Sequence, residues 1–311
     1  MTGRDGPGAP AGAWLEAEVK PPWPFRLPRG GGGDAVMRVR RGVVIRLLHV
    51  GGEPVLVRAW QRLDGQIAFH AVALGAGDRG HLEIAIERMR FALGVDDDYH
   101  ELYEAFRSDR LLGTAIRRKR WHRPRRRPWP WEALAWSIVK QLIESSRAAE
   151  IQRRMVLRWG ARYEGVDAAT LRDVPTPELI ADRAPAELAA CDLAPARALA
   201  LIHAAREVSA ARADPADPAH DNRLLAIREI GPWTIQCLGL YGRGEPDSLP
   251  AGDLAYIKLV GRLAGLGRRA TVEEVEAFFA PYAPYRGLAG EFVLAAHHRA
   301  LAAGPPLRYA A

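Results

Sequence analysis

The spacing of apolar residues changes once along this chain. From Val36 to Leu74, β-branched residues alternate with polar ones, and glycine-containing dipeptides that favour tight hairpin turns interrupt the alternation at Gly51-Gly52 and Asp64-Gly65. From about residue 130 to 303, apolar residues recur at helical spacing. No strand–helix–strand alternation is present, which argues against Rossmann and P-loop enzymes. The sequence therefore predicts an α+β chain, with a small antiparallel sheet domain with helices followed by an all-α domain.

Composition and pattern together divide the chain into four segments. Residues 1–34 are rich in glycine and proline, which predicts a flexible arm or an extended cover over the first domain. We expect an α+β N-terminal domain at 35–115, with three or four strands and a helix that ends at Gly94. A basic, proline-rich linker at 116–130 then leads into a helical domain at 131–305.

The charge of the chain favours a polyanionic partner. The formal net charge is +7, and eight of the eleven residues from Arg117 to Arg127 are lysine or arginine. A solvated basic loop, a nucleic-acid groove and an anionic membrane surface all fit this run, although Pro124, Pro128 and Pro130 prevent a continuous membrane-lying helix. The sequence has neither a run of about 20 apolar residues nor the apolar core of a secretory signal at its start. We therefore expect no membrane partner and a cytoplasmic location.

The two cysteines give no case for a metal or a disulfide framework. Cys191 and Cys237 stand far apart, without a Cys-x-x-Cys or a Cys/His pattern. Neither a structural zinc nor an iron–sulfur cluster is predicted, and each cysteine is expected to be a small buried residue.

The segment from Leu224 to Lys258 carries the most information about function. It begins with a helix, a tight turn at Ile230-Gly231-Pro232 and a second helix near Trp233. Such a turn presents backbone N–H groups at a helix N-terminus, where they bind phosphate without reading bases. Further along, Asp253 follows Pro250-Ala251-Gly252 and opens another helix, and a simple N-cap is the alternative to a chemical role for its carboxylate.

Taken together, these motifs resemble the HhH-GPD superfamily of base-excision DNA glycosylases. Gly231-Pro232-Trp233-Thr234 matches the family's hairpin, and Asp253 in LPAGDLAYIK matches its catalytic aspartate. Upstream, AWSIVKQLIES is similar to the family segment that lies against distorted DNA. A sheet-containing N-terminal domain without an iron–sulfur cluster fits the 3-methyladenine DNA glycosylase II branch. The resemblance covers about 125–300, less clearly 36–110, and makes 131–305 the HhH-GPD catalytic domain.

The resemblance also implies roles for individual residues. Leu142 would fill the gap that a flipped base leaves in the duplex, with Gln141 as its polar neighbour. Trp233 would form a wall of the base pocket. Core packing is the alternative for both Leu142 and Trp233. We expect further DNA contacts at the hairpin, at Lys258 and in the basic run, from Ile230, Gly231, Pro232, Thr234, Lys258, Arg125, Arg126 and Arg127.

The expected chemistry needs one well-placed carboxylate. Cleavage of an N-glycosidic bond builds positive charge on the deoxyribose, and Asp253 would stabilise that charge and orient or deprotonate water. An alkylated purine already carries positive charge, so it leaves as a neutral base without an obligatory acid. Bifunctional members place a nucleophilic lysine where this chain has Trp233. The sequence therefore predicts a monofunctional glycosylase that acts on damaged double-stranded DNA as a monomer.

Several residues depart from the family pattern. Glu229 stands at a glycine of the hairpin, which disfavours the monovalent cation that the resemblance implies there, and no other cofactor is expected. Lys140 and Glu144 replace the glycine and serine that flank Gln141, and Cys237 replaces an aromatic pocket residue. Because of these departures, oxidised or deaminated bases are alternative substrates to alkylated purines. Two alternative functions lie outside this enzyme class: a non-catalytic DNA-damage-binding protein and an all-α ligand-binding domain.

Overall fold

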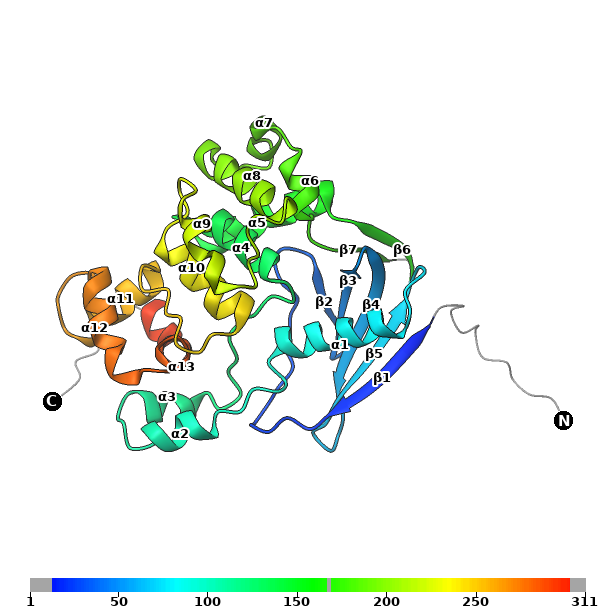
Figure 1. The fold of residues 1–311 in the computed structure, drawn as a ribbon. Coiled ribbons are helices and arrows are strands. Elements are labelled where there is room, and N and C mark those ends of the chain that lie inside the picture. Colours follow the sequence, from blue (N-terminus) through cyan, green and yellow to red (C-terminus); the bar gives the residue numbers. More distant parts are fainter. Residues whose placement is uncertain (1–12, 167–168, 303–311) are drawn as a thin grey trace.

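The computed structural model describes residues 13–166 and 169–302. Its N-terminal part is a five-stranded antiparallel sheet in the order β1-β5-β4-β3-β2. Helix α1 lies against this sheet (Figure 1), and two short helices follow. The elements are β1 (Trp14–Val19), β2 (Met37–Arg40), β3 (Val43–Val50), β4 (Glu53–Gln61), β5 (Ile67–Ala73), α1 (Arg79–Leu93), α2 (His100–Phe106) and α3 (Leu112–Arg118).

The glycine dipeptides set the register of the central strands. Gly51 and Gly52 both have positive φ in the turn between β3 and β4, and Gly65 does so between β4 and β5. Left-handed backbone of this kind favours glycine, so the two predicted hairpins are confirmed. Helix α1 buries Leu82 and Met89 in the core over the sheet.

The described part of the predicted arm contains an extended strand that lies along the first domain, so a flexible arm is wrong there. Strand β1 pairs with β5 along its whole length, and Leu15 and Val19 pack against the sheet core. Their alternation with exposed glutamates is the period of a half-buried edge strand, which the surrounding glycines and prolines mask in the sequence. The sheet therefore has five strands rather than three or four. Residues 1–12 of the predicted arm lie outside the described residues.

The second part of the chain is helical apart from one hairpin. Strands β6 and β7 pair with each other, and Leu171 of β7 packs with Leu47 and Leu56 of the sheet. The expected all-α domain therefore contains a short β-ribbon. The elements are α4 (Pro130–Lys140), α5 (Ser145–Trp159), β6 (Arg162–Val166), β7 (Ala169–Arg172), α6 (Pro177–Ala181), α7 (Pro185–Ala189), α8 (Pro195–Ser209), η1 (Pro218–His220), α9 (Asp221–Leu225), α10 (Pro232–Leu238), η2 (Gly239–Arg243), α11 (Leu254–Leu263), α12 (Val272–Phe279), η3 (Ala280–Tyr282) and α13 (Arg286–Ala302).

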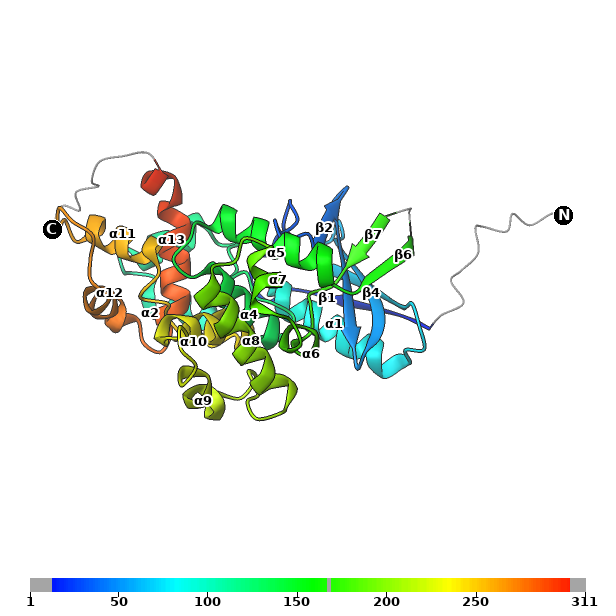
Figure 2. The same cartoon turned by 90° about the horizontal axis from the view of Figure 1, so that it is seen from above.

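Helix α4 is the central element of this helical part. Every residue from Trp131 to Val139 is buried, and α5, α8, α10 and η2 pack around the helix. A Cβ atom at Gly242 of η2 would lie 2.7 Å from the Cβ atom of Ala133, so glycine permits this close approach. Figure 2 shows the sheet at one end of the molecule and α11, α12 and α13 at the other, with α4 between them.

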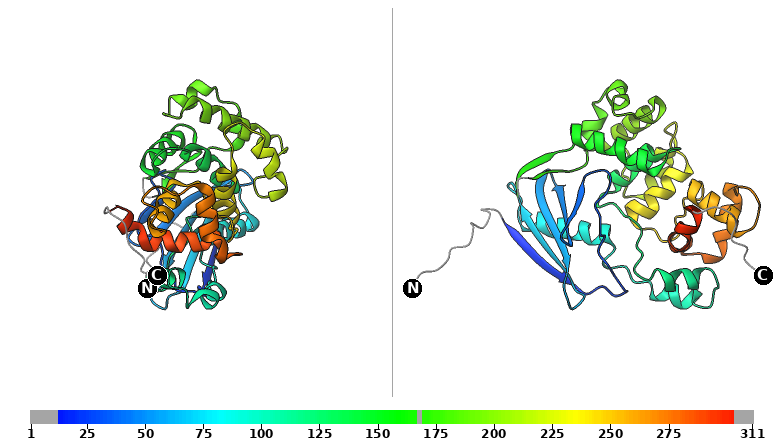
Figure 3. Two further views of the ribbon diagram at one scale, coloured as in Figure 1. Left: turned by 90° about the vertical axis from the view of Figure 1, so that its left-hand side faces the viewer. Right: turned by 180° about the vertical axis from the view of Figure 1, so that it is seen from behind.

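A second helical core lies at that far end. Leu112 and Ile116 of α3 are buried together with Phe292 and Val293 of α13. The views in Figure 3 show α2 and α3 beside the C-terminal helices and apart from the sheet. The two short helices were predicted as part of the N-terminal domain, but their apolar faces are buried against the C-terminal helices.

The basic segment between the two parts is an ordered junction. Arg126 forms an ion pair with Asp97, with 2.6 Å between Nη1 and Oδ1, and its side chain is 9% exposed. Arg127 pairs with Asp34 at 2.6 Å and with Glu132 at 3.1 Å. Burial opposes the charge of Arg127, but the carboxylates of Glu132 and Asp34 outweigh it and raise the pKa of this arginine. The two guanidiniums therefore neutralise carboxylates of the protein instead of facing solvent as a DNA-binding surface would.

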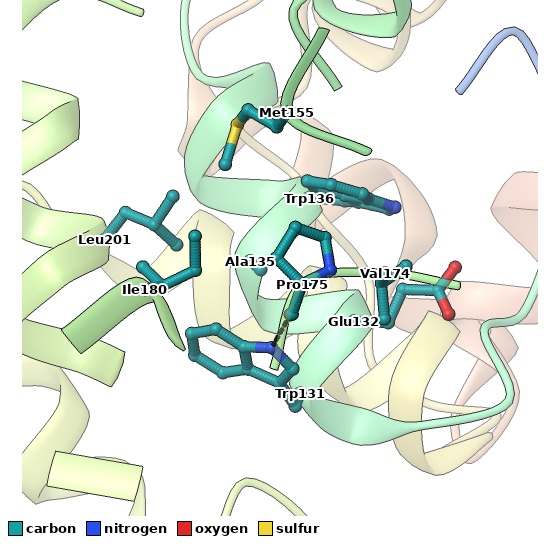
Figure 4. Close-up of a pocket in the computed structure, with 9 residues that line it drawn as sticks. All are labelled: Trp131, Glu132, Ala135, Trp136, Met155, Val174, Pro175, Ile180 and Leu201. Atoms are coloured by element: carbon teal, nitrogen blue, oxygen red, sulfur yellow. Dashed lines mark hydrogen bonds between the residues drawn. The ribbon is translucent and has the colours of Figure 1, made fainter. Parts of the chain in front are cut away.

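A small apolar cavity lies beside α4. Its volume is about 10 Å³, which is the space of one water molecule at most. Figure 4 shows Trp131, whose indole N–H donates to the carbonyl of Pro175 at 3.0 Å, and Glu132, whose carboxylate points away from the apolar side chains. The cavity is far too small for a nucleobase, so the candidate site lies elsewhere.

In the part of the chain that the structure describes, no helix has the length and apolar character that crossing a membrane requires.

Candidate functional site

The predicted helix-hairpin-helix motif is present. Helix α9 ends at Leu225, the chain turns at Ile230-Gly231, and α10 begins at Pro232. A side chain at Gly231 would meet no atom within 4 Å, so the backbone of the turn is open. Ile230 and Thr234 are buried and hold the turn from inside. Of the predicted contacts at this hairpin, the side chains of Ile230 and Thr234 face the protein, whereas Gly231 and Pro232 lie at the surface.

A short loop between α4 and α5, residues 141–144, forms the second element of the site, and we call it the wedge loop. Leu142 has φ of 56° and its side chain is fully exposed, at 101%. Left-handed backbone is rare for a bulky residue and marks a position that its surroundings enforce. Core packing, the alternative role for Leu142, is therefore wrong.

The wedge loop is held by hydrogen bonds at both sides. Nε2 of Gln141 donates to the carbonyl of Glu229 at 2.7 Å and to the hydroxyl of Thr234 at 2.9 Å. Arg197 of α8 donates to the carbonyl of Gln141 at 2.7 Å and to that of Val139 at 3.2 Å. These contacts join the wedge loop to the hairpin and fix the backbone that presents Leu142. No local motif in the sequence indicates this role for Arg197.

Asp253 caps helix α11 and remains accessible. Its Oδ1 atom accepts a hydrogen bond from the backbone N–H of Ala255 at 2.9 Å, so the predicted N-cap is confirmed. Its Oδ2 atom lies 3.3 Å from Nζ of Lys140 at the end of α4. The side chain of Asp253 is 20% exposed and that of Lys140 is 36% exposed. One carboxylate oxygen is thus fixed by the backbone, and the other meets a single mobile cation.

Trp233 stands beside this carboxylate. A Cβ atom at Gly252, the residue before Asp253, would lie 3.6 Å from Cδ1 of the Trp233 ring, and the ring centroid lies 6.0 Å from Nζ of Lys140. The residue is half-buried. Its indole Nε1 is buried and has no hydrogen-bond partner among the described residues. An aromatic face, a carboxylate and an ammonium therefore share one small region.

Cys237 lies on the interior side of the region that Asp253, Lys140 and Trp233 share, and its thiol is uncharged. Burial raises the pKa of the Cys237 thiol well above its usual value; Lys140 lowers it and Asp253 raises it to a smaller extent. The thiol is therefore protonated at neutral pH, and the two charged groups lie within electrostatic range of it.

A network behind Asp253 was not predicted from the sequence. Glu291 of α13 accepts a hydrogen bond from the Tyr241 hydroxyl at 2.8 Å and lies 3.0 Å from Nε2 of His122. The Tyr256 hydroxyl is 3.5 Å from the same carboxylate. Burial, followed by the charge of Glu291, raises the pKa values of Tyr241 and Tyr256 well above normal, so both remain neutral donors. These residues come from four separate segments, and no local motif joins them.

Two predicted basic contacts face solvent. Arg125 is exposed in the junction, and Lys258 is exposed on α11, one turn beyond Asp253. At the hairpin, the carbonyl oxygen of Glu229 already accepts a hydrogen bond from Gln141. A monovalent cation at this turn stays a prediction.

The fold and the site define a helix-hairpin-helix protein with a carboxylate after the hairpin. Residues 135–284 match the family model described as HhH-GPD superfamily base excision DNA repair protein. The matched range contains the wedge loop, the hairpin and Asp253, so the chain is similar to this superfamily over the region of the candidate site.

Curated relatives share this part of the chain at low identity. A probable bifunctional transcriptional activator/DNA repair enzyme AlkA of Mycobacterium tuberculosis is 25% identical over 206 residues, which are 66% of this chain and 41% of that protein. A DNA-3-methyladenine glycosylase of Bacillus subtilis is 24% identical over 201 residues, covering 63% of this chain and 66% of the relative. The chain therefore spans about two fifths of the mycobacterial relative's length.

The architecture also matches a solved structure over nearly the whole chain. The 3-methyladenine DNA glycosylase from Archaeoglobus fulgidus aligns with a TM-score of 0.74 at 20% identity, covering 93% of this chain and all of that one. The shared fold thus includes the N-terminal sheet as well as the helical part, which confirms the predicted fold class.

Proposed function

We propose that the protein is a monofunctional DNA glycosylase that hydrolyses the N-glycosidic bond of a damaged base in duplex DNA. The observation that carries this proposal is the placement of Asp253. Its carboxylate is fixed by the N–H of Ala255, is partly exposed and meets Lys140, whose Nζ atom lies 6.0 Å from the ring centroid of Trp233. A helix cap alone gives no reason for the neighbouring hairpin and wedge loop. The names of the curated relatives support the same reaction class.

In the proposed reaction, Asp253 acts on the sugar. As the bond to the base breaks, positive charge grows on the deoxyribose, and a carboxylate in a partly dehydrated site stabilises this charge. The same carboxylate orients a water molecule toward C1′ and accepts its proton. Because oxygen Oδ1 is already oriented by the helix cap, the group loses little freedom when the transition state forms. The reaction as proposed uses water and no cofactor.

Base flipping is assigned to the wedge loop and to Trp233. An exposed leucine on a strained backbone is suited to enter the base stack and replace the lost stacking contacts. Gln141 would lie beside it at the duplex, although its amide also supports the hairpin. The flipped base would then stack on Trp233, next to Asp253.

DNA binding is assigned to the open turn and to exposed cations. Gly231 and Pro232 would bring the start of α10 to a phosphate. Lys258 and Arg125 are exposed and free to approach the backbone of the duplex. We propose that one chain binds one duplex as a monomer, in the cytoplasm at the nucleoid.

The monofunctional assignment rests on Trp233. An indole cannot form a Schiff base with the sugar, and the nearby Lys140 has its Nζ atom engaged by Asp253. The product would therefore be an intact strand with an abasic site. Borohydride trapping of the protein on damaged duplex checks this point, because only a Schiff base gives a covalent adduct.

One candidate substrate class is the alkylated purines, such as 3-methyladenine and 7-methylguanine, which the relatives' names suggest. Oxidised or deaminated bases are the second class, and the cation at Lys140 favours them. The test is incubation of the purified protein with duplexes of each class, followed by chromatography of free bases. Base release without strand cleavage supports the proposal, whereas salt-sensitive binding without release from any duplex would indicate a non-catalytic DNA-damage-binding protein.

A further inference from the structure

We infer that Lys140 selects neutral modified bases over cationic alkylated purines. The inference rests on the proposed function, since it assigns a substrate class to the same site. It starts from the position of one ammonium group, 3.3 Å from Oδ2 of Asp253 and 6.0 Å from the ring centroid of Trp233. A base that stacks on Trp233 next to Asp253 enters the field of this cation.

The charge balance of the pocket disfavours a cationic base. Lys140 and Asp253 form a pair with no net charge, so the carboxylate offers an incoming cation much less attraction than it would alone. The ammonium of Lys140 also faces the Trp233 ring. It therefore replaces a cationic purine as the positive charge that the ring attracts. Glu291 lies further inside and is occupied by Tyr241 and His122.

The same ammonium assists the departure of a neutral base. When the N-glycosidic bond breaks, its electron pair moves onto the base, which becomes an anion unless it is protonated or stabilised. An ammonium beside the base stabilises this charge by a charge-assisted hydrogen bond. The oxygen of water forms the new bond to C1′ as the bond from C1′ to the base breaks. Asp253 accepts the proton that water loses, and this proton is then transferred to the departing base, which returns Asp253 to its carboxylate form. The sum is hydrolysis, with no further reactant.

The test compares two lesions in one duplex sequence, hypoxanthine as the neutral base and 7-methylguanine as the cationic one. Single-turnover release is measured for the wild type and for Lys140→Met, which keeps the length of the side chain but not its charge. Lys140→Arg keeps the charge, and Lys20→Met removes an exposed lysine at the end of β1 as a matched control. Duplex binding by each variant shows that it is folded.

We expect Lys140→Met to slow release of hypoxanthine and to speed release of 7-methylguanine, so that the ratio of the two rates falls by about tenfold or more. Lys140→Arg keeps most of the wild-type ratio, and Lys20→Met leaves it unchanged. An equal loss for both lesions would mean that Lys140 only positions Asp253, and it would overturn the inference, as would an unchanged ratio.

The failure of the proposed function has a different signature. Wild-type protein that binds both duplexes but releases neither base would contradict the glycosylase assignment, and the inference would fail with it. If the wild type and Lys140→Met release 7-methylguanine at the same rate, the glycosylase assignment stands. Only the selection by charge is then overturned.

Discussion

The side-chain amide of Gln141 donates a hydrogen bond to the hydroxyl of Thr234 at 2.9 Å. This contact joins the wedge loop to the hairpin, and its two residues are 93 positions apart in the sequence. Thr234 is buried and Leu142, next to Gln141, is fully exposed. A buried residue of the hairpin therefore supports the loop that presents the exposed Leu142.

Leu142→Ala should reduce base release from duplex DNA by about tenfold, because the smaller side chain fills less of the gap that the flipped base leaves. Release from single-stranded DNA, which has no such gap, should change much less. Single-turnover rates on both substrates check this prediction. Leu63, exposed in the turn between β4 and β5, provides a matched control as Leu63→Ala. Equal losses on both substrates would argue against a wedge.

Glu229→Gly should stabilise the protein and tighten DNA binding. Glu229 has φ of 74°, a conformation that costs a residue with a Cβ atom about 1 kcal/mol and costs glycine little. Its side chain also brings a negative charge to the proposed phosphate contact. Denaturant unfolding and fluorescence anisotropy measure the two effects. Glu229→Ala separates them, since it removes the charge and keeps the strain; a less stable Glu229→Gly protein would contradict this account.

Replacement by alanine should affect different properties at Arg127 and Arg125: the stability of the fold at Arg127 and the binding of DNA at Arg125. Arg127→Ala removes the cation that pairs with the buried carboxylate of Asp34 and leaves Glu132 with Arg46 alone, and should destabilise the fold by about 3 kcal/mol. Arg125→Ala should leave stability unchanged and lower the salt dependence of DNA binding by about one unit of slope. Thermal unfolding and salt titrations check the pair. If the Arg127→Ala protein were as stable as the wild type, the structural role of Arg127 would be contradicted and its predicted role as a DNA contact would be favoured.

Local patterns predicted the elements that carry their own signals. Gly51-Gly52 and Asp64-Gly65 place two hairpins, and the hairpin at Gly231 is followed by a capping Asp253. Each of these signals comes from backbone geometry that only a few residue types favour. The same rules misjudged β1, because prolines and glycines surround a strand whose stability comes from its partner β5.

Long-range pairing explains the rest of what the sequence did not reveal. The run from Arg117 to Arg127 indicates a polyanion, yet Arg126 and Arg127 find carboxylates distant in sequence. Lys140 departs from the family pattern, which is visible in the sequence. Its contact with Asp253 is not, because that contact depends on how α4 and α11 pack. Charge runs show what a segment can bind, and the tertiary fold decides whether the protein itself supplies the partner.

The most direct test of the central claim compares wild-type protein with Asp253→Asn on duplex DNA carrying one damaged base. Asparagine keeps the side-chain oxygen that accepts the N–H of Ala255, so the helix cap and the fold should persist. We predict that base release falls by a factor of at least about 100, because the charge that stabilises the sugar cation is lost, while duplex binding remains. Wild-type rates of release by Asp253→Asn would contradict the account and remove Asp253 from the chemistry.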